Sequence, residues 1–180
     1  MLDAAIRLLK RGGASSITTN RIAETAGVSI GSVYQYFPNK HALFVALHER
    51  HIRQVDAAMR RKVAEGTGRS LENVVLGLLE AMVETHAADP ILAELLQSEV
   101  PHRADGTIEF SVRLHSVFLA ALAPHAKRLS RRTDLNTRVF IMARMVDVLG
   151  HAIVLRRPRG LSLGAAKSEA SRAILVYLES

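Results

Sequence analysis

The stretch of sequence that decides the fold is residues 18–40, which read TTNRIAETAGVSIGSVYQYFPNK. Two short helices that cross over a tight turn need a small residue where they cross, and Ala23 supplies it. The turn needs a positive φ, which Gly27 adopts at no steric cost. Ser29 then stands where a helix N-cap belongs. The pattern predicts a helix-turn-helix, with a first helix that ends at Gly27 and a second that ends before Pro38.

Apolar residues of the same stretch supply the packing that this motif requires. We expect four side chains to point inward and to fix the crossing angle of the two helices. They are Ile22, Val28, Val33 and Phe37. Sequences that meet one of these requirements are common, whereas sequences that meet all of them at these spacings are rare. The helix-turn-helix is therefore the prediction from which the others follow.

The N-terminal third carries nearly all of the excess positive charge. The 180 residues have a net charge of +7. Residues 1–62 hold ten Lys and Arg against four Asp and Glu, whereas residues 63–180 contribute a net charge of only +1. Positive charge concentrated in one part of a chain favours a polyanion as that part's partner. A solvated basic surface would produce the same composition, so charge alone leaves both interpretations open.

Composition also bounds the class of protein. Hydrophobic residues make up 48% of the chain, which indicates a folded protein. Cysteine is absent, which excludes disulfides and thiolate chemistry and is typical of a cytoplasmic protein. No run of about 18 apolar residues is free of charge, so we expect no membrane-spanning helix and no membrane partner. The first residues, MLDAA, do not resemble a secretory signal.

Glycine and proline divide the chain into segments with helical periodicity, and no strand pattern occurs. The predicted class is all-α, with an N-terminal three-helix domain over residues 1–45 and a C-terminal helical bundle over residues 46–180. The run Gly66-Thr67-Gly68 is the best candidate linker, and residues 101–106 are a predicted loop. Besides the two helices of residues 18–40, we expect helices over residues 2–11, 39–65, 70–88, 91–96, 107–123, 136–156 and 162–180.

Residues 2–50 resemble the DNA-binding domain of the TetR (tetracycline repressor) family of transcriptional regulators. The resemblance rests on Ala26-Gly27-Val28-Ser29, Gly31-Ser32-Val33-Tyr34, Tyr36-Phe37 and Lys40. It implies a homodimer that binds double-stranded DNA, with the third helix of each N-terminal domain in the major groove. It also implies a divergent C-terminal domain that binds a small-molecule effector. The rest of the chain resembles the family only in length, helical content and position.

Candidate DNA contacts follow from this resemblance. Thr18 or Thr19 caps the second helix and can hydrogen-bond a phosphate, which Arg21 can also reach. Gln35 is the best candidate for a hydrogen bond to a base edge, with adenine its natural partner. Lys40 opens the fourth helix, where its ammonium group and the helix dipole both attract a phosphate. The full set is Thr18, Thr19, Arg21, Ser29, Ile30, Gly31, Ser32, Tyr34, Gln35, Tyr36 and Lys40.

Three positions on the predicted recognition helix need comment. Gly31 lets the backbone approach the bases closely. Tyr34 and Tyr36 resemble the phosphate-contacting aromatic residues of the family, although half-buried packing is an alternative role for Tyr34. Ile30 stands where the family often has a basic residue. This departure removes a possible phosphate or guanine contact and leaves an apolar one, which suits a thymine methyl group.

The segment from Asn136 to Arg156 is apolar on almost every side, so it must be covered on all sides. A second subunit is the economical cover in a domain of this size. The helix over Ser162–Ser180 offers small residues at Ala166, Ala170 and Ala173, which allow close approach. We therefore expect a homodimer in which these two helices pair with their symmetry mates. The alternative is a monomeric core that contains both helices.

The C-terminal domain also carries the candidate effector pocket. Its helices between residues 70 and 155 are aliphatic and Met-rich, which favours an apolar or amphipathic ligand. A stripe of Arg144, Asp147 and His151 on one helix suits structural ion pairing, with ligand recognition as the alternative. Solvent-facing or core positions are the alternative for the candidate histidines. The candidate pocket residues are Met82, His86, His115, Phe118 and Met145.

Enzymatic activity is the first rival to this regulatory interpretation. No Gly-rich phosphate loop follows a strand, and no nucleophile–base pair is evident, so we predict no catalytic residues and no cofactor. His48 and His51 are three residues apart, but a third metal ligand is lacking, so we predict no metal site. An architectural DNA-binding protein without an effector, and an activator with the same fold, are further alternatives. The favoured prediction is a repressor that binds a palindromic operator as a homodimer and is released by its effector.

Overall fold

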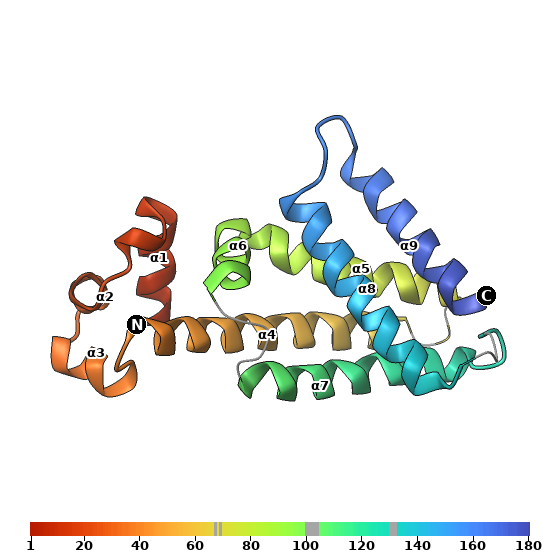
Figure 1. Ribbon diagram of the computed structural model, residues 1–180, viewed down its shortest axis with the longest axis horizontal. Coiled ribbons are helices and arrows are strands. Elements are labelled where there is room, and N and C mark those ends of the chain that lie inside the picture. The colour runs from red at the N-terminus through yellow and green to blue at the C-terminus, as the bar shows by residue number, and fades with distance from the viewer. Residues whose placement is uncertain (67, 69, 100–104, 130–132) are drawn as a thin grey trace. The chain divides into compact units, whose positions relative to one another are not determined.

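The computed structural model describes residues 1–66, 68, 70–99, 105–129 and 133–180, with the backbone alone for residues 105–113. The described chain is helical and contains no strand, so the predicted all-α class is confirmed (Figure 1). The elements are α1 (Leu2–Gly12), η1 (Ala14–Ser16), α2 (Thr19–Ala26), α3 (Ile30–Tyr36), α4 (Lys40–Glu65), α5 (Leu71–Ala88), α6 (Pro90–Glu99), α7 (Asp105–Leu122), η2 (Ala123–His125), α8 (Leu135–Leu155) and α9 (Leu163–Glu179).

Two predicted boundaries around α6 and α7 were wrong. Helix α6 begins at Pro90, because proline lacks the N–H that the first helical position leaves unpaired. The Asp89 carboxylate accepts a hydrogen bond from the Leu92 N–H (3.3 Å) and supports this start. Helix α7 begins at Asp105, two residues before the predicted start, so residues 105 and 106 of the predicted loop are helical. The other residues of that loop, 101–104, lie outside the described part of the chain, as does residue 67 of the predicted linker.

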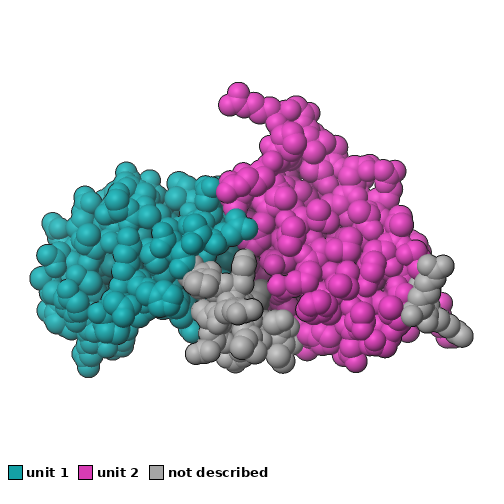
Figure 2. Space-filling view, in the orientation of Figure 1, with its two compact units in different colours: residues 1–52, 89–108 teal, residues 53–88, 109–180 magenta. Residues whose placement is uncertain are grey.

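The chain folds into two compact units (Figure 2). The N-terminal unit comprises residues 1–52 and 89–108, and the C-terminal unit comprises residues 53–88 and 109–180. The sequence pattern suggested a division in chain order at residue 45. The units depart from that order because α6 packs with α1. Periodicity locates a helix along the chain but does not identify the helices against which it packs.

The N-terminal unit has its own core, which holds the helix-turn-helix in place. Buried side chains of α1, α2, α3 and α4 meet there with three leucines of α6. The core consists of Ala5, Leu8, Leu9, Ile17, Ile22, Ala23, Val33, Leu43, Phe44, Leu47, Leu92, Leu95 and Leu96.

In the C-terminal unit, α5 packs against both α8 and α9. The fully buried side chains there include Met82, Phe118, Met142 and Ile174. Helices α5 and α8 approach closely at Gly150, where an added Cβ would lie 3.1 Å from the Cβ of Met82. None of the helices in the described ranges combines the length and apolarity needed to cross a bilayer.

Candidate nucleic-acid interface

Backbone and capping geometry build the predicted helix-turn-helix. The Thr18 hydroxyl accepts a hydrogen bond from the Arg21 N–H (3.3 Å), which makes Thr18 the N-cap of α2. Gly27 ends α2 in the left-handed conformation, with φ 67° and ψ 35°. The Ser29 hydroxyl then accepts from the Ser32 N–H (3.0 Å) and caps α3. The predicted turn and both predicted caps are confirmed.

The packing beneath the motif agrees with the prediction at three of four positions. Ile22 and Val33 are buried, and Phe37 is half-buried against the same core. Val28 is 38% exposed, so its predicted inward orientation was wrong. Its N–H is hydrogen-bonded back to the carbonyl of Ala23 (3.0 Å). Val28 thus belongs to the turn that closes α2, and that turn lies at the surface.

Helix α3 presents a largely solvent-exposed face. Ile30, Gly31 and Gln35 are all exposed, and the Tyr34 ring is 51% exposed. Ser32 is half-buried and shares a hydrogen bond with the Ser29 hydroxyl (2.9 Å). Large apolar and aromatic side chains grouped in solvent indicate a surface that binds a partner. The predicted reading face is therefore accessible to a duplex.

The phosphate-binding candidates surround α3. The Thr19 hydroxyl donates a hydrogen bond to the Tyr34 hydroxyl (3.4 Å), which holds the phenol near the N-terminus of α2. Tyr36 is two-thirds exposed and carries its hydroxyl into solvent. The hydroxyl groups of Thr19 and Tyr34 lie beside the free N–H groups of α2, and together they can hydrogen-bond one phosphate oxygen.

Lys40 has a structural partner that its sequence position did not reveal. Its ammonium group donates a hydrogen bond to the carbonyl of Ala14 in η1 (3.1 Å) and lies 5.2 Å from the centroid of the Phe44 ring. The N-cap of α4 is Asn39, whose side-chain oxygen accepts from the Ala42 N–H (2.8 Å). An ammonium group has three donors, so Lys40 can keep this bond and still contact a phosphate.

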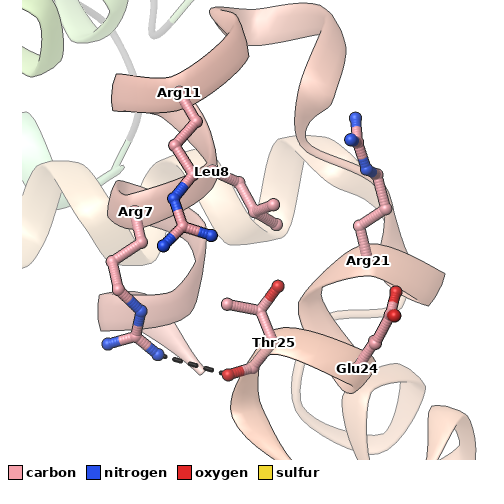
Figure 3. Close-up of a pocket in the computed structure, with 6 residues that line it drawn as sticks. All are labelled: Arg7, Leu8, Arg11, Arg21, Glu24 and Thr25. Carbon is pink, nitrogen blue, oxygen red and sulfur yellow. Dashed lines mark hydrogen bonds between the residues drawn. The ribbon is translucent and has the colours of Figure 1, made fainter.

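Other cations of the N-terminal unit divide into paired and unpaired groups. Lys10 forms an ion pair with Asp89 (3.0 Å). Arg50 pairs with Asp3 (2.6 Å), and this hydrogen bond and charge lower the pKa of Asp3. Arg21 lies on the exposed flank of α2, beside two arginines of α1 that the prediction missed, Arg7 and Arg11 (Figure 3). Their spacing of four residues on the polar side of the first helix was the signal that could have revealed them.

The effector candidates divide between the core and the surface of the C-terminal unit. Met82 and Phe118 are buried in one apolar cluster, against which Met145 packs. His115 lies nearer the surface, where its Nε2 is 3.3 Å from the side-chain oxygen of Asn136. His86 is almost fully buried. The packing thus brings the apolar candidates together and leaves His115 at their margin.

The buried His86 contacts the predicted polar stripe of α8. Its ring lies edge-on to that of His151, with centroids 4.0 Å apart, and its Nδ1 donates to the carbonyl of Met82 (2.7 Å). Burial, reinforced by the charge of His151, lowers the pKa of His86 to about 4. Asp147 lies 3.4 Å from His151 and 3.7 Å from Arg144. The structural ion pairing predicted for this stripe is therefore present.

Part of the predicted dimer surface is used within the chain. Ala166 and Ala170 are buried against Leu79 and Val83 of α5, so their small size serves intrachain packing. Ala173 is exposed. The prediction that all three alanines admit a partner helix was wrong for the first two, because periodicity does not distinguish packing within a chain from packing between chains.

Large apolar side chains remain exposed on both helices of the predicted interface. On α8 they are Phe140, which is 54% exposed, and Val148, which is 63% exposed. On α9 they are Leu163 and Val176. An exposed group of this kind is typical of a surface that another protein covers.

Sequence comparison finds a known family that matches the first part of the chain. Residues 1–47 match the family described as bacterial regulatory proteins, tetR family. The HTH-type transcriptional repressor KstR of Mycolicibacterium smegmatis is 31% identical over 97 residues, which cover 53% of this chain and 46% of that protein. The nucleoid occlusion factor SlmA of Actinobacillus pleuropneumoniae is 45% identical over 51 residues, which cover 28% of this chain and 25% of that protein. The matched residues thus cover less than half of the length of either relative.

Structural comparison extends the likeness to the whole chain. The transcriptional regulator FadR of Bacillus subtilis, solved in complex with stearoyl-CoA, has a TM-score of 0.75 and 17% sequence identity. The match covers 98% of this chain and 97% of that one, and at this identity it shows a shared fold alone. Residues 1–47 thus match the tetR family of bacterial regulatory proteins, and the full length of the chain shares its fold with FadR.

Proposed function

We propose that the protein is a repressor that binds a palindromic operator as a homodimer and is released when a small apolar or amphipathic effector binds. The observation that carries this proposal is the exposed face of α3, which stands on a correctly capped helix-turn-helix. The exposed Tyr34 and Ile30 of this face, together with the excess of Lys and Arg over residues 1–62, favour a DNA duplex as the partner. The similarity of the N-terminal residues to the repressor KstR supports the same conclusion.

In this proposal α3 lies in the major groove. Gln35 hydrogen-bonds an adenine edge through both atoms of its amide, and Ile30 contacts a thymine methyl group. Thr19, Tyr34 and Lys40 hold backbone phosphates on either side of the groove and so fix the register of α3 along the DNA.

Dimerisation supplies the two-fold symmetry that a palindrome requires. The exposed apolar side chains of α8 and α9 form the isologous interface, in which each helix meets its symmetry mate. The two copies of α3 then lie about one turn of DNA apart, roughly 34–36 Å. An effector that favours a different separation weakens DNA binding, and DNA weakens effector binding by the same factor.

The proposed effector is an amphipathic molecule with a long acyl chain. The buried interior of the C-terminal unit is aliphatic and contains Met82, Met142 and Phe118, which can enclose such a chain. The structural neighbour FadR was solved in complex with stearoyl-CoA, an amphipathic molecule with a long acyl chain. Polar groups at the margin, such as His115, would then face the headgroup of the ligand.

Selection of bound DNA from a random-sequence pool tests this function. The proposal predicts an inverted repeat and its release by micromolar stearoyl-CoA or a related acyl thioester. Enrichment of no sequence would contradict the operator. Release by none of a panel of apolar and amphipathic compounds would contradict the effector.

A second candidate function is a DNA-binding architectural protein without an effector. The 45% identity to the nucleoid occlusion factor SlmA over 51 residues favours it. In that case genome-wide binding should show many dispersed sites, and no compound should release the DNA. The repressor proposal predicts few sites, which lie in promoters.

A further inference from the structure

A hollow of about 480 Å³ lies between α1 and α2 in the N-terminal unit, and no residue of α3 lines it. Arg7 and Arg11 of α1 and Arg21 of α2 line it, and in Figure 3 the side chain of Arg21 runs in the opposite direction to the other two. Buried Leu8 contributes an apolar wall, and the remaining lining residues are Glu24 and Thr25. Three guanidinium groups face one carboxylate, so the hollow carries excess positive charge.

The turn between α1 and α2 holds this hollow open. The buried hydroxyl of Ser16 lies 2.6 Å from the carbonyl of Leu8 and 2.7 Å from that of Gly13 and shares its one hydrogen between them, which fixes the chain that joins the two helices. Arg7 donates to the carbonyl of Thr25 (3.3 Å) and so links α1 to the far end of α2. The backbone that carries the three arginines is therefore held in place before any ligand arrives.

Two of these arginines are available to a ligand. Within the described residues, no hydrogen bond or ion pair engages the side chain of Arg11 or Arg21. Their neighbour Lys10 differs, because Asp89 neutralises it. Arg7 uses a single donor on Thr25, and a guanidinium group has five. Like charges that converge without a counter-ion repel one another, and an anion would relieve that repulsion.

We propose that the hollow formed by Arg7, Arg11 and Arg21 binds a phosphoryl group. Guanidinium groups bind phosphate through paired hydrogen bonds, and the side chains that line this hollow include three of them. The phosphoryl group belongs either to the DNA backbone beside the operator half-site or to a free phosphorylated molecule. The DNA source rests on the function proposed above, whereas the free source does not.

The first experiment measures the salt dependence of DNA binding by fluorescence anisotropy. The double variant Arg11→Gln/Arg21→Gln should lower the slope of log K against log salt by about one unit, the contribution of one phosphate. Lys10→Gln is the control, because it removes one positive charge from α1 at a residue that does not line the hollow, and it should leave the slope unchanged. Equal melting temperatures of these proteins would confirm that the fold persists.

The second experiment titrates pyrophosphate into the protein without DNA and follows the heat released. A phosphorylated ligand in the hollow predicts binding by the wild type and its loss in Arg11→Gln/Arg21→Gln. Glu24→Gln should strengthen this binding, because it removes the one carboxylate that faces the hollow.

The outcomes distinguish a DNA phosphate from a free phosphorylated ligand, and they distinguish failure of the phosphate site from failure of the proposed function. A lower slope identifies a DNA phosphate, and an unchanged slope with pyrophosphate binding identifies a free ligand. An unchanged slope with no pyrophosphate binding would overturn the inference. A wild type that binds no DNA would contradict the proposed function, while the titration would still decide whether the hollow binds phosphate.

Discussion

Three side chains set the N-termini of the helices that carry the candidate DNA contacts. Thr18, Ser29 and Asn39 each accept a hydrogen bond from the backbone N–H three residues ahead. Each cap satisfies one of the N–H groups that a helix start leaves free, and the remaining ones stay available to an anion. The same capping residue therefore begins the helix and leaves backbone N–H groups free for the proposed phosphate contact.

Lys40→Ala should weaken binding to every DNA sequence by the same factor and reduce the salt slope by about one unit, because a phosphate contact carries no sequence information. Anisotropy titrations at several salt concentrations measure both quantities. Lys40 also bonds to Ala14 in the free protein. If that bond were its only role, the variant would melt at a lower temperature and its salt slope would match the wild type.

His86 should make stability depend on pH. Its pKa is about 4 in the folded protein and returns to an ordinary value of about 6.5 on unfolding. The contribution of His86 to the free energy of unfolding is therefore complete above pH 6.5 and is lost as the pH falls towards 4. In that range His86 is protonated in the unfolded chain and neutral in the folded chain. Between pH 7 and pH 5 the loss should be about 2 kcal/mol.

Urea unfolding of the wild type and His86→Asn at both pH values measures this loss. Asparagine can keep the hydrogen bond to the carbonyl of Met82 but cannot titrate. Burial opposes the charge on His151, yet its hydrogen bonds with Asp147 and the charge of Asp147 raise its pKa overall, so its own contribution is lost at high pH and not at low pH. Both proteins retain His151, so the difference between them reports His86 together with its interaction with His151. Equal losses in the two proteins would refute its role.

At the scale of helices, local signals could be predicted from the sequence and packing partners could not. The helix-turn-helix followed from Ala23, Gly27 and Ser29, because a crossing, a turn and a cap each depend on a few neighbouring residues. The placement of α6 in the N-terminal unit depends on contacts between Leu92 or Leu95 and helices far away in the sequence. The hollow between α1 and α2 was not predicted for the same reason, because it depends on how two helices pack against each other.

Close packing of α5 against α8 makes Gly150 difficult to replace. Gly150→Ala should destabilise the protein, because the new methyl group meets the Cβ and Cγ of Met82. Overpacking costs about 1–3 kcal/mol, which exceeds the gain of about 1 kcal/mol from the helix propensity of alanine. Gly164→Ala in α9 is the control, since no atom lies within 4 Å of its added Cβ. Denaturant unfolding that ranks Gly150→Ala as stable as Gly164→Ala would contradict this packing.

At the scale of the whole molecule, the account requires two chains. Light scattering at micromolar concentration should give twice the chain mass of 19.7 kDa. Val148→Asp should yield monomers, because it places a charge in the proposed interface on α8. Ile91→Asp on α6 replaces another exposed apolar side chain outside that interface and should stay dimeric. A wild type of 19.7 kDa would disprove the dimer.

The central claim is that α3 reads bases, and Gln35→Ala tests it most directly. Affinity is measured on the selected operator and on random DNA at one salt concentration. The account predicts a loss of roughly 1–3 kcal/mol at one base pair of each half-site, with binding to random DNA unchanged. An equal loss on both DNAs would show that Gln35 does not read sequence and would contradict the claim.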